Sequence, residues 1–193
     1  MKIDQELGQH SPQRESVLTI GVFDGVHRGH RYLMSYLTRE AKRTGRLAVV
    51  VTLRNHPASV FEPDFKPRYL IRLEERLGLI KGLGVDFAVP MSFDLEMSRL
   101  RARDFAALLQ KHLRMRELVV GPDFAMGYRR EGDVKTLTCL GREMGFTVNV
   151  VRPLLDEEGK AIRSTTVREA LARGDVTRVA ALMGRNFTMT GTV

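Results

Sequence analysis

This sequence has no tryptophan and only one cysteine among its 193 residues. The single cysteine, Cys139, has no partner for a disulfide within the chain, which excludes the small disulfide-stabilised scaffolds typical of secreted proteins. Such sparing use of cysteine is typical of a reducing compartment, so we expect a cytoplasmic protein.

Long hydrophobic runs are also lacking. The longest one, residues 47–53, is interrupted by Thr52 and is far shorter than the ~20 residues that a membrane-spanning helix needs. Residues 1–16 are polar and contain no apolar stretch of the kind found in a secretory signal, so we expect a flexible N-terminal arm. We therefore expect no interaction with a membrane.

Neither an internal repeat nor a linker rich in Pro, Gly and Ser is present, which favours one compact domain over residues 17–184. Lys and Arg number 31 against 23 Asp and Glu, giving a net charge of +8 and an isoelectric point near 10.1. This excess suits an anionic partner, whether nucleic acid, an acidic membrane or a polyphosphate ligand. Charge alone does not choose among the three.

Short apolar runs alternate with segments of helical period along most of the chain. Residues 17–23 and 47–53 are predicted strands, and residues 28–43 between them are a predicted helix. Strands that are apolar throughout and separated by helices predict an α/β protein with a doubly wound parallel sheet and helices on both faces. Further strands are predicted at residues 85–89, 118–121 and 146–151, and further helices at residues 73–83, 105–113 and 134–144.

The end of the chain has a different pattern. Residues 163–173 and 175–183 are two predicted short helices, each followed by a glycine of the kind that ends helices. Residues 185–193 (RNFTMTGTV) have a strand-like composition but cannot form a sheet alone. We expect them to be the first strand of a further domain that is missing from this chain.

The strongest motif is GVFDGVHRGH at residues 21–30, where a predicted strand ends in a turn and a helix begins. A helix N-terminus presents free N–H groups to phosphate, and His27 and His30 share one face of the first turn. Gly29 would let a ligand approach the backbone closely. The two histidines could also be surface residues or zinc ligands, but no third ligand has matching spacing. Their place at the carboxyl end of the first strand favours a ligand site.

A second motif, IRSTTVR at residues 162–168, precedes a predicted helix. Ser164 or Thr165 would cap this helix, and the hydroxyls, the first N–H groups and Arg168 could bind a second phosphate. The alternative is ordinary capping beside a solvated arginine.

Three other features are less specific. Residues 121–128 (GPDFAMGY) are either a loop that covers a ligand or a plain surface turn, and His56, alone, is more typical of a structural residue. Five arginines flank one predicted helix, where solvation is their simplest explanation. They are Arg99, Arg101, Arg103, Arg114 and Arg116.

The two motifs resemble the HxGH and ISSTxxR motifs of bacterial FAD synthetases (bifunctional riboflavin kinase/FMN adenylyltransferases). The amino-terminal module of that family is an FMN adenylyltransferase with the Rossmann-like nucleotidylyltransferase fold. The resemblance runs from about residue 17 to the last residue and includes His56-Pro57, LEERLGLIKGLGVD and GPDFAMG, which is similar to the family's GxDFxFG loop.

This resemblance implies that ATP and FMN react to give FAD and pyrophosphate, with Mg²⁺ on the phosphate oxygens and no covalent enzyme intermediate. His27, His30, Ser164 and Arg168 would be catalytic, the last two on the β- and γ-phosphates. The implied ATP-binding residues are Gly21, Phe23, Asp24, Gly25, His27, His30, Ser164, Thr165 and Arg168. The implied flavin-binding residues are Asn55, His56, Pro57, Phe61, Asp123 and Phe124.

The sequence departs from the family pattern at three positions. Asn55 replaces a proline after the second strand, Arg163 replaces the first serine of ISST, and Met126 replaces a phenylalanine. These changes bear on the flavin site more than on the chemistry. A larger departure is the missing riboflavin kinase barrel, so we expect no kinase activity from this chain, and a separate riboflavin kinase as a partner.

Two alternative functions stay open from the sequence. The first is a nucleotidylyltransferase for another acceptor, such as a phosphorylated vitamin or a lipid-precursor head group. The second is a binding module without turnover that holds RNA or a protein. The intact histidines and Arg168 count against the second, as does the lack of alternating aromatic and basic residues typical of single-strand binders.

Overall fold

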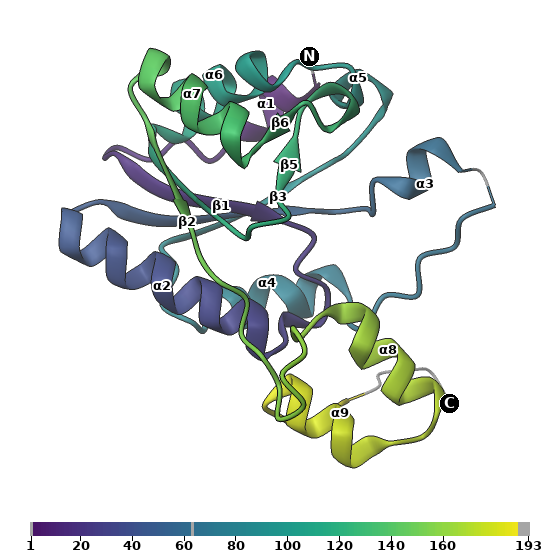
Figure 1. Ribbon diagram of the computed structural model, residues 1–193. Coiled ribbons are helices and arrows are strands. Elements are labelled where there is room, and N and C mark those ends of the chain that lie inside the picture. The colour runs from purple at the N-terminus through teal and green to yellow at the C-terminus, as the bar shows by residue number, and fades with distance from the viewer. Residues whose placement is uncertain (1, 63, 189–193) are drawn as a thin grey trace.

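A five-stranded parallel sheet forms the centre of the protein (Figure 1). The computed structural model describes residues 2–62 and 64–188. The strands of the sheet are β1 (Ser16–Gly21), β2 (Leu47–Leu53), β3 (Phe87–Met91), β4 (Met115–Val120) and β7 (Thr147–Val150), and a small antiparallel pair is β5 (Ala125–Met126) and β6 (Gly132–Asp133). The α-helices are α1 (Lys2–Gly8), α2 (Arg28–Thr44), α3 (Ala58–Phe61), α4 (Leu73–Lys81), α5 (Leu95–Ser98), α6 (Ala102–Leu113), α7 (Val134–Met144), α8 (Ser164–Ala172) and α9 (Val176–Met183). Two 3-10 turns are η1 (Asp24–Val26) and η2 (Tyr128–Arg130).

The strand order β3-β2-β1-β4-β7 places β1 in the middle of the sheet, and every pairing is parallel. From β1 the chain moves outward to β2 and β3, and then returns to the other side of β1 for β4 and β7. The direction of winding therefore reverses between β1 and β4, and ligands bind at the carboxyl ends of strands beside such a reversal. The predicted doubly wound α/β fold is confirmed.

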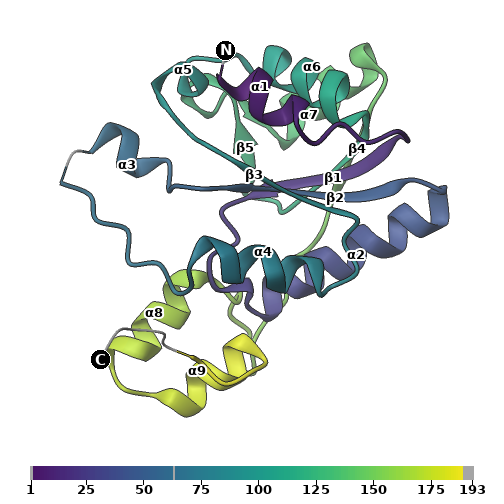
Figure 2. The ribbon, with the colours of Figure 1, turned by 180° about the vertical axis from the view of Figure 1, so that it is seen from behind.

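Helices cover both faces of the sheet (Figures 1 and 2). One face packs against α1, α6 and α7, and the opposite face packs against α2 and α4. All seven residues of β2 are buried, as expected for a strand covered on both faces. Helices α8 and α9 form a third, smaller cluster with Leu70 and Ile162, next to α2 and below the sheet in Figure 1.

The predicted flexible arm at residues 1–16 is wrong for the segment that forms α1. Ile3 and Leu7 lie one helical turn apart and are both buried in the core beneath the sheet face that α6 covers. Asp4 accepts hydrogen bonds from Lys111 (3.0 Å) and pairs with His112 (2.8 Å), both on α6. Two apolar residues at helical spacing are too weak a pattern to predict a helix within a polar segment. The helix is stabilised by its packing against α6, which the local sequence does not show.

Several boundaries differ from those predicted. Strand β1 ends at Gly21, and Phe23 takes a left-handed conformation (φ 50°) because the chain turns away from the sheet there. Strand β3 begins and ends two residues later than predicted. Residues 185–188 contain no strand, and the rest of the predicted terminal strand, residues 189–193, lies outside the described residues.

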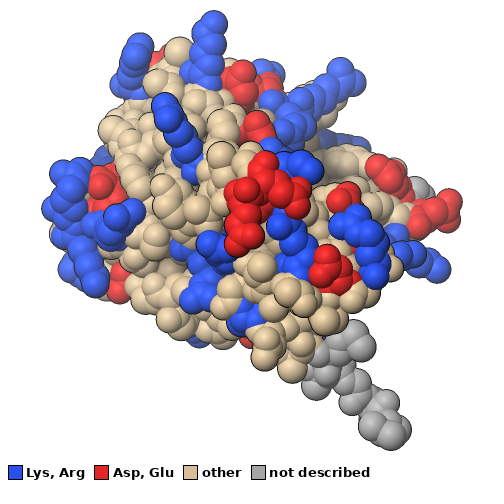
Figure 3. Space-filling view, turned by 60° about the horizontal axis from the view of Figure 1, so that its bottom comes forward, with Lys and Arg blue, Asp and Glu red and all other residues tan. Residues whose placement is uncertain are grey.

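Positive and negative side chains are interspersed on the face that carries α8 and α9 (Figure 3). On the other side, three of the arginines around α6 are paired: Arg101 with Glu131 (2.7 Å), Arg116 with Glu15 (2.8 Å), and Arg103 with Glu143. Among the described residues, no helix is long and apolar enough to cross a membrane.

Candidate active site

His27 and His30 lie together at the N-terminus of α2, which follows the turn after β1. His27 is the N-cap of this helix, and its Nδ1 accepts a hydrogen bond from the backbone N–H of His30 (3.3 Å). The two imidazole rings stack with their centroids 3.6 Å apart, and the edge of Phe23 packs against His30 at 5.2 Å. The spacing that predicted a shared face is confirmed, with direct ring contact in addition.

This geometry selects one form of each ring. Because Nδ1 of His27 accepts a hydrogen bond, neutral His27 carries its proton on Nε2. Burial, followed by the charges of Arg185 and Arg168, lowers the pKa of His27 to about 4. Desolvation, followed by His27 and Arg76, holds the pKa of His30 well below its usual value. Both histidines are therefore neutral at pH 7.

Two ring nitrogens of this pair lack partners. His27 Nε2 and His30 Nδ1 are buried and make no hydrogen bond to the described part of the chain. Buried polar atoms are normally satisfied, so two unsatisfied nitrogens side by side mark a position where a ligand would bind. His27 Nε2–H is a donor suited to an anionic oxygen.

Gly29 has a structural role in addition to the one predicted. A Cβ on Gly29 would lie 2.9 Å from the carbonyl oxygen of Ile162 and 3.2 Å from the His27 ring. The missing side chain therefore lets the protein's own backbone approach closely, and Gly29 also lines the pocket where a ligand approach is predicted. It brings the N-terminus of α2 against residue 162, two residues before α8 begins.

The N-terminus of α8 is not capped by a side chain. Arg163 is the N-cap residue and makes no side-chain capping bond, whereas the Ser164 hydroxyl donates to the carbonyl oxygen of Asp24 (2.9 Å). The expectation that Ser164 caps the helix is wrong, because the turn after β1 lies close enough to compete for the hydroxyl. The first N–H groups of α8 thus lack side-chain acceptors and can bind an anion.

Asp24 connects the turn after β1 to two other segments. Its carboxylate, only 2% exposed, accepts hydrogen bonds from the backbone N–H groups of Leu70 (3.0 Å) and Ile71 (3.4 Å). It also pairs with Arg168 Nη2 at 2.5 Å, and Arg168 Nε donates to the Arg68 carbonyl (2.8 Å). Asp24 is therefore a buried anchor for α8 and does not line a pocket.

A pocket of about 320 Å³ opens between the N-termini of α2 and α8, and we call it the polar pocket after the histidines and hydroxyl groups in its lining. Both histidines line it, as do Ser164 and Thr165, so the structure brings these four predicted residues together. Four other residues expected at the nucleotide do not line it: Phe23, Asp24, Gly25 and Arg168. The remaining lining residues are Gly29, Tyr32, Leu33, Gly121, Pro122, Val151, Arg152, Pro153, Leu154, Ile162 and Arg163.

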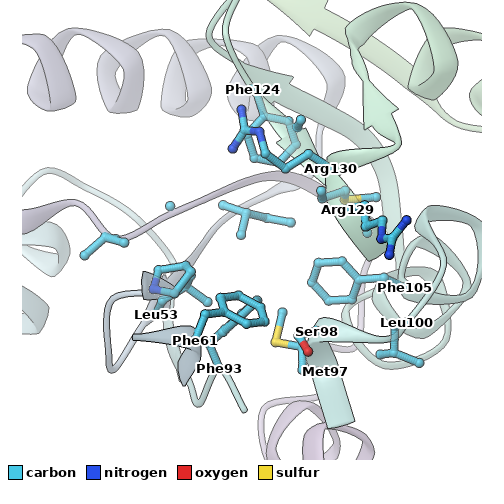
Figure 4. A pocket seen from close by; sticks show the side chains of 17 residues that line it. Leu53, Phe61, Phe93, Met97, Ser98, Leu100, Phe105, Phe124, Arg129 and Arg130 are labelled. Atoms are coloured by element: carbon cyan, nitrogen blue, oxygen red, sulfur yellow. The ribbon is translucent and has the colours of Figure 1, made fainter. Parts of the chain in front are cut away.

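A second pocket, of about 360 Å³, lies on the face of the sheet that α6 covers (Figure 4). Its lining is mostly apolar, and the side chains of Phe61, Phe93 and Phe105 point into it. Such a pocket suits a flat aromatic ligand. The full lining is Ile20, Gly21, Val22, Leu53, Pro57, Phe61, Phe93, Met97, Ser98, Leu100, Phe105, Phe124, Ala125, Met126, Gly127, Arg129 and Arg130.

The six predicted flavin residues divide into two groups. Pro57, Phe61 and Phe124 line the apolar pocket, and so does Gly21, which was expected at the nucleotide. Asn55 lies behind the pocket, where its amide donates to and accepts from the backbone of Phe93 (2.7 and 2.9 Å).

His56 is also absent from the lining of both pockets. Its Nδ1 accepts a hydrogen bond from the Ala58 N–H (3.2 Å), and its ring packs against Phe65 at 5.1 Å. These local contacts are those of a structural residue, and the flavin-binding role of His56 stays a prediction.

The loop of residues 121–127 borders both pockets. Its first two residues line the polar pocket, and its last four line the apolar pocket. Asp123, between them, pairs with Arg163 Nη2 (2.6 Å), and its carbonyl accepts a hydrogen bond from Arg130 (3.2 Å). Arg163, the departure from the ISST pattern, thus ties the loop to the N-terminus of α8.

Sequence reasoning missed two arginines near the site. Arg76 on α4 is 1% exposed and donates to the carbonyls of Val22 and Leu53 (both 2.8 Å), which fixes the ends of β1 and β2. Arg185 donates to the carbonyls of Gly25 and Val26. A charged residue on the buried face of α4 was a usable signal for Arg76, and nothing in the local pattern indicated Arg185.

Comparisons with known proteins agree with this geometry. The sequence model of the FAD synthetase family matches residues 9–166. A bifunctional riboflavin kinase/FMN adenylyltransferase of Escherichia coli (strain K12) is 40% identical over 184 residues, which are 95% of this chain and 58% of that protein. A protein of the same name from Pseudomonas fluorescens is 35% identical over 181 residues, 93% of this chain and 58% of its own. The chain thus spans somewhat over half the length of these relatives.

A solved structure described as a macrolide-efflux protein from Streptococcus pneumoniae has a similar fold, with a TM-score of 0.85 and 27% identity. The match covers 97% of this chain and 60% of that one. The family match includes every residue that lines the two pockets. This chain belongs to the FAD synthetase family.

Proposed function

We propose that this chain is an FMN adenylyltransferase, which transfers the AMP moiety of ATP to FMN and releases pyrophosphate. One observation carries the proposal: a polar pocket with two helix N-termini and an apolar aromatic pocket share the loop of residues 121–127. A triphosphate suits the first pocket and an isoalloxazine ring suits the second. Their shared border is where the FMN phosphate would meet the α-phosphorus of ATP.

The reaction is an in-line displacement at the α-phosphorus. An oxygen of the FMN phosphate forms the new P–O bond while the bond from the α-phosphorus to the oxygen of the β-phosphate breaks, and pyrophosphate takes the bonding electrons. Negative charge shifts onto the oxygens around the α-phosphorus and onto the leaving group, so positioning and donated hydrogen bonds suffice for catalysis.

The neutral histidines support this role. His27 Nε2–H is a buried donor without a protein partner, and water is largely excluded around it. A preorganised donor in such a place stabilises developing charge without reorganisation. His30 stacks on His27 and holds the ring in this orientation.

At the other end of the triphosphate, the first N–H groups of α8 and the Thr165 hydroxyl would bind the β- and γ-phosphates. Arg168 uses Nε and Nη2 on Arg68 and Asp24, and in the described part of the chain its Nη1 makes no hydrogen bond. That nitrogen remains for a phosphate oxygen. Arg168 does not line the polar pocket, so we propose that it is first an anchor of α8 and that its Nη1 binds an outer phosphate oxygen of the triphosphate.

Mg²⁺ would come with the nucleotide. The described residues contain no group of three His, Cys, Asp or Glu that could hold a metal ion, and Asp24 and Asp123 are each paired with an arginine. These residues do not fit a resident metal site, and Mg²⁺ is commonly bound mainly by substrate phosphates and water. In the proposed reaction the carboxylates of Asp24 and Asp123 therefore take no direct part.

The apolar pocket discriminates between acceptors. A small phosphorylated head group would leave most of its aromatic lining unused, whereas a tricyclic flavin would bury it. On the face that Figure 3 shows, charges of both signs are interspersed, which there favours small anionic substrates over a nucleic-acid strand. We further propose a cytoplasmic enzyme whose FMN comes from phosphorylation of riboflavin.

The test is to incubate the protein with [α-³²P]ATP, MgCl₂ and FMN, and to separate the products. Labelled FAD together with unlabelled pyrophosphate is the expected result. Parallel reactions with riboflavin, pantetheine 4′-phosphate and glycerol 3-phosphate identify the acceptor. Label transferred to one of the latter two, with none to FMN, would reject the proposed substrate.

A further inference from the structure

The turn between β1 and α2 is held in an unfavourable backbone conformation. Gly25 has φ 82°, and Val26 has φ 40°, directly before His27. Glycine tolerates this region, but for a β-branched valine it is rare, because Cβ crowds the carbonyl oxygen. Such residues persist only where the surrounding structure enforces them, and they concentrate at active sites.

Arg185 supplies the enforcing contact. Its guanidinium donates from Nη2 to the carbonyl oxygen of Gly25 (2.8 Å) and from Nη1 to that of Val26 (3.2 Å). The planar fork thus spans two successive carbonyls of the turn. Lysine has no equivalent geometry, because its ammonium is a single point.

The backbone of residue 185 is itself held close to α2. It follows Gly184, the C-cap of α9, whose carbonyl accepts a hydrogen bond from Arg31 (3.3 Å). Arg28 donates in the same way to the Ala181 carbonyl (3.2 Å). The end of α9 is thus fixed against the helix that carries both histidines, and Arg185 reaches the turn from there.

The charge of Arg185 also acts on the next residue of the turn. After burial, it is the main cause that lowers the pKa of His27. Arg185 thereby favours the neutral ring, whose Nδ1 accepts from the His30 N–H and whose Nε2 keeps the proton.

We infer that Arg185 is a positioning residue for adenylyl transfer, which fixes the Gly25–Val26 turn so that His27 Nε2 points at the reacting phosphate. The inference rests on the proposed function. Arg185 lies beyond residues 9–166, the part of the chain that matches the family. The C-terminal end of α9 therefore contributes to the catalytic turn.

The experiment compares Arg185→Met with Arg31→Met. Both variants remove a guanidinium from the contact between α2 and the end of α9, but Arg31 bonds only the Gly184 carbonyl and does not touch the turn. For Arg185→Met we expect kcat to fall by roughly ten-fold or more, since small displacements of reacting groups cost up to ~100-fold, while the KM for ATP changes by less than about three-fold. Arg31→Met should retain the wild-type kcat.

A second readout does not depend on turnover. Imidazole ¹⁵N NMR of the wild type should show His27 as the Nε2–H tautomer at pH 7, and Arg185→Met should show a mixture of tautomers. If Arg185→Met does not fold, the same kcat and tautomer measurements are made on Arg185→Lys. The same changes are expected, because the lysine ammonium cannot span both carbonyls.

The outcomes are distinguishable. A kcat that falls less than about five-fold beyond that of Arg31→Met, or an unchanged His27 tautomer, would overturn the inference. If the wild type forms no FAD, the proposed function fails, whereas the tautomer measurement still decides whether Arg185 positions His27.

Discussion

Replacing Asp24 by asparagine tests whether its buried carboxylate holds α8 against the turn after β1. Asparagine keeps one oxygen for the Leu70 N–H but places an amide NH₂ where the other oxygen faces Arg168 at 2.5 Å. Breaking a buried ion pair typically costs ~3–5 kcal/mol. Arg168 is 34% exposed and regains part of its hydration, so we expect the lower end, about 3 kcal/mol. For a chain of this length that corresponds to a fall in Tm of roughly 6–12 °C.

The same substitution should weaken ATP binding. Ser164 and Arg168 both hold the first turns of α8 to the Asp24 segment, and that helix N-terminus lines the polar pocket. Loosening it displaces the phosphate donors, each worth ~1.5–3 kcal/mol to a charged oxygen, so we expect the KM for ATP to rise about ten-fold. The KM for FMN should change little, since the apolar pocket does not include α8.

Asp156→Asn is the matched control. Asp156 is also largely buried, accepts hydrogen bonds from two backbone N–H groups and pairs with Arg178 at 2.6 Å, but it lines neither pocket. Thermal unfolding should show that both variants are destabilised, and steady-state kinetics should show a raised KM for ATP in Asp24→Asn alone. An equal rise in both, or a wild-type KM in Asp24→Asn, would refute the reasoning.

Three further predictions concern the histidines and the apolar pocket. His30→Ala should lower kcat by at least about 100-fold while FMN binding, followed by flavin fluorescence, stays nearly intact; unchanged turnover would remove His30 from the catalytic group. The pKa of His27 is about 4 in the folded protein and 6.5 in the unfolded chain, so the unfolded chain binds a proton more readily. The contribution of His27 to the free energy of unfolding should therefore be complete above pH 6.5 and be lost as the pH falls toward 4. Denaturant titrations should therefore show that the wild type loses about 2 kcal/mol more than His27→Gln between pH 7 and pH 5, because the loss that comes from the lowered pKa of His30 is common to both proteins. Phe124→Ala should raise the KM for FMN by about ten-fold or more, whereas Asp123→Asn should not, because Asp123 does not line the apolar pocket.

The sheet and the position of the histidines follow from local sequence patterns. Strand β2 and helix α2 need only runs of apolar residues and a helical period, which neighbouring residues alone determine. The fold class then places the turn after β1 at the carboxyl edge of the sheet. These features could be predicted because each depends on residues that are close in the chain.

The roles of individual residues at the site depend on distant contacts and could not be predicted in this way. Asp24 was expected at the nucleotide, but its carboxylate accepts hydrogen bonds from residues 70, 71 and 168. Asn55 was expected at the flavin, but its amide matches the backbone of Phe93, 38 positions away. Helix α1 likewise depends on distant residues, because Ile3 and Leu7 pack against the core that α6 helps to form.

The loop of residues 121–127 has a consequence for inhibitor design. A compound that fills the apolar pocket must press on Phe124, and Pro122, two residues earlier, lines the polar pocket. The displacement would pass along the chain to the nucleotide side, so such a compound should alter the apparent affinity for ATP as well as compete with FMN. Under the proposed function, inhibitors that occupy the apolar pocket are therefore expected to show mixed inhibition toward ATP, and chemical series that differ only at the Phe124 contact should differ in that pattern.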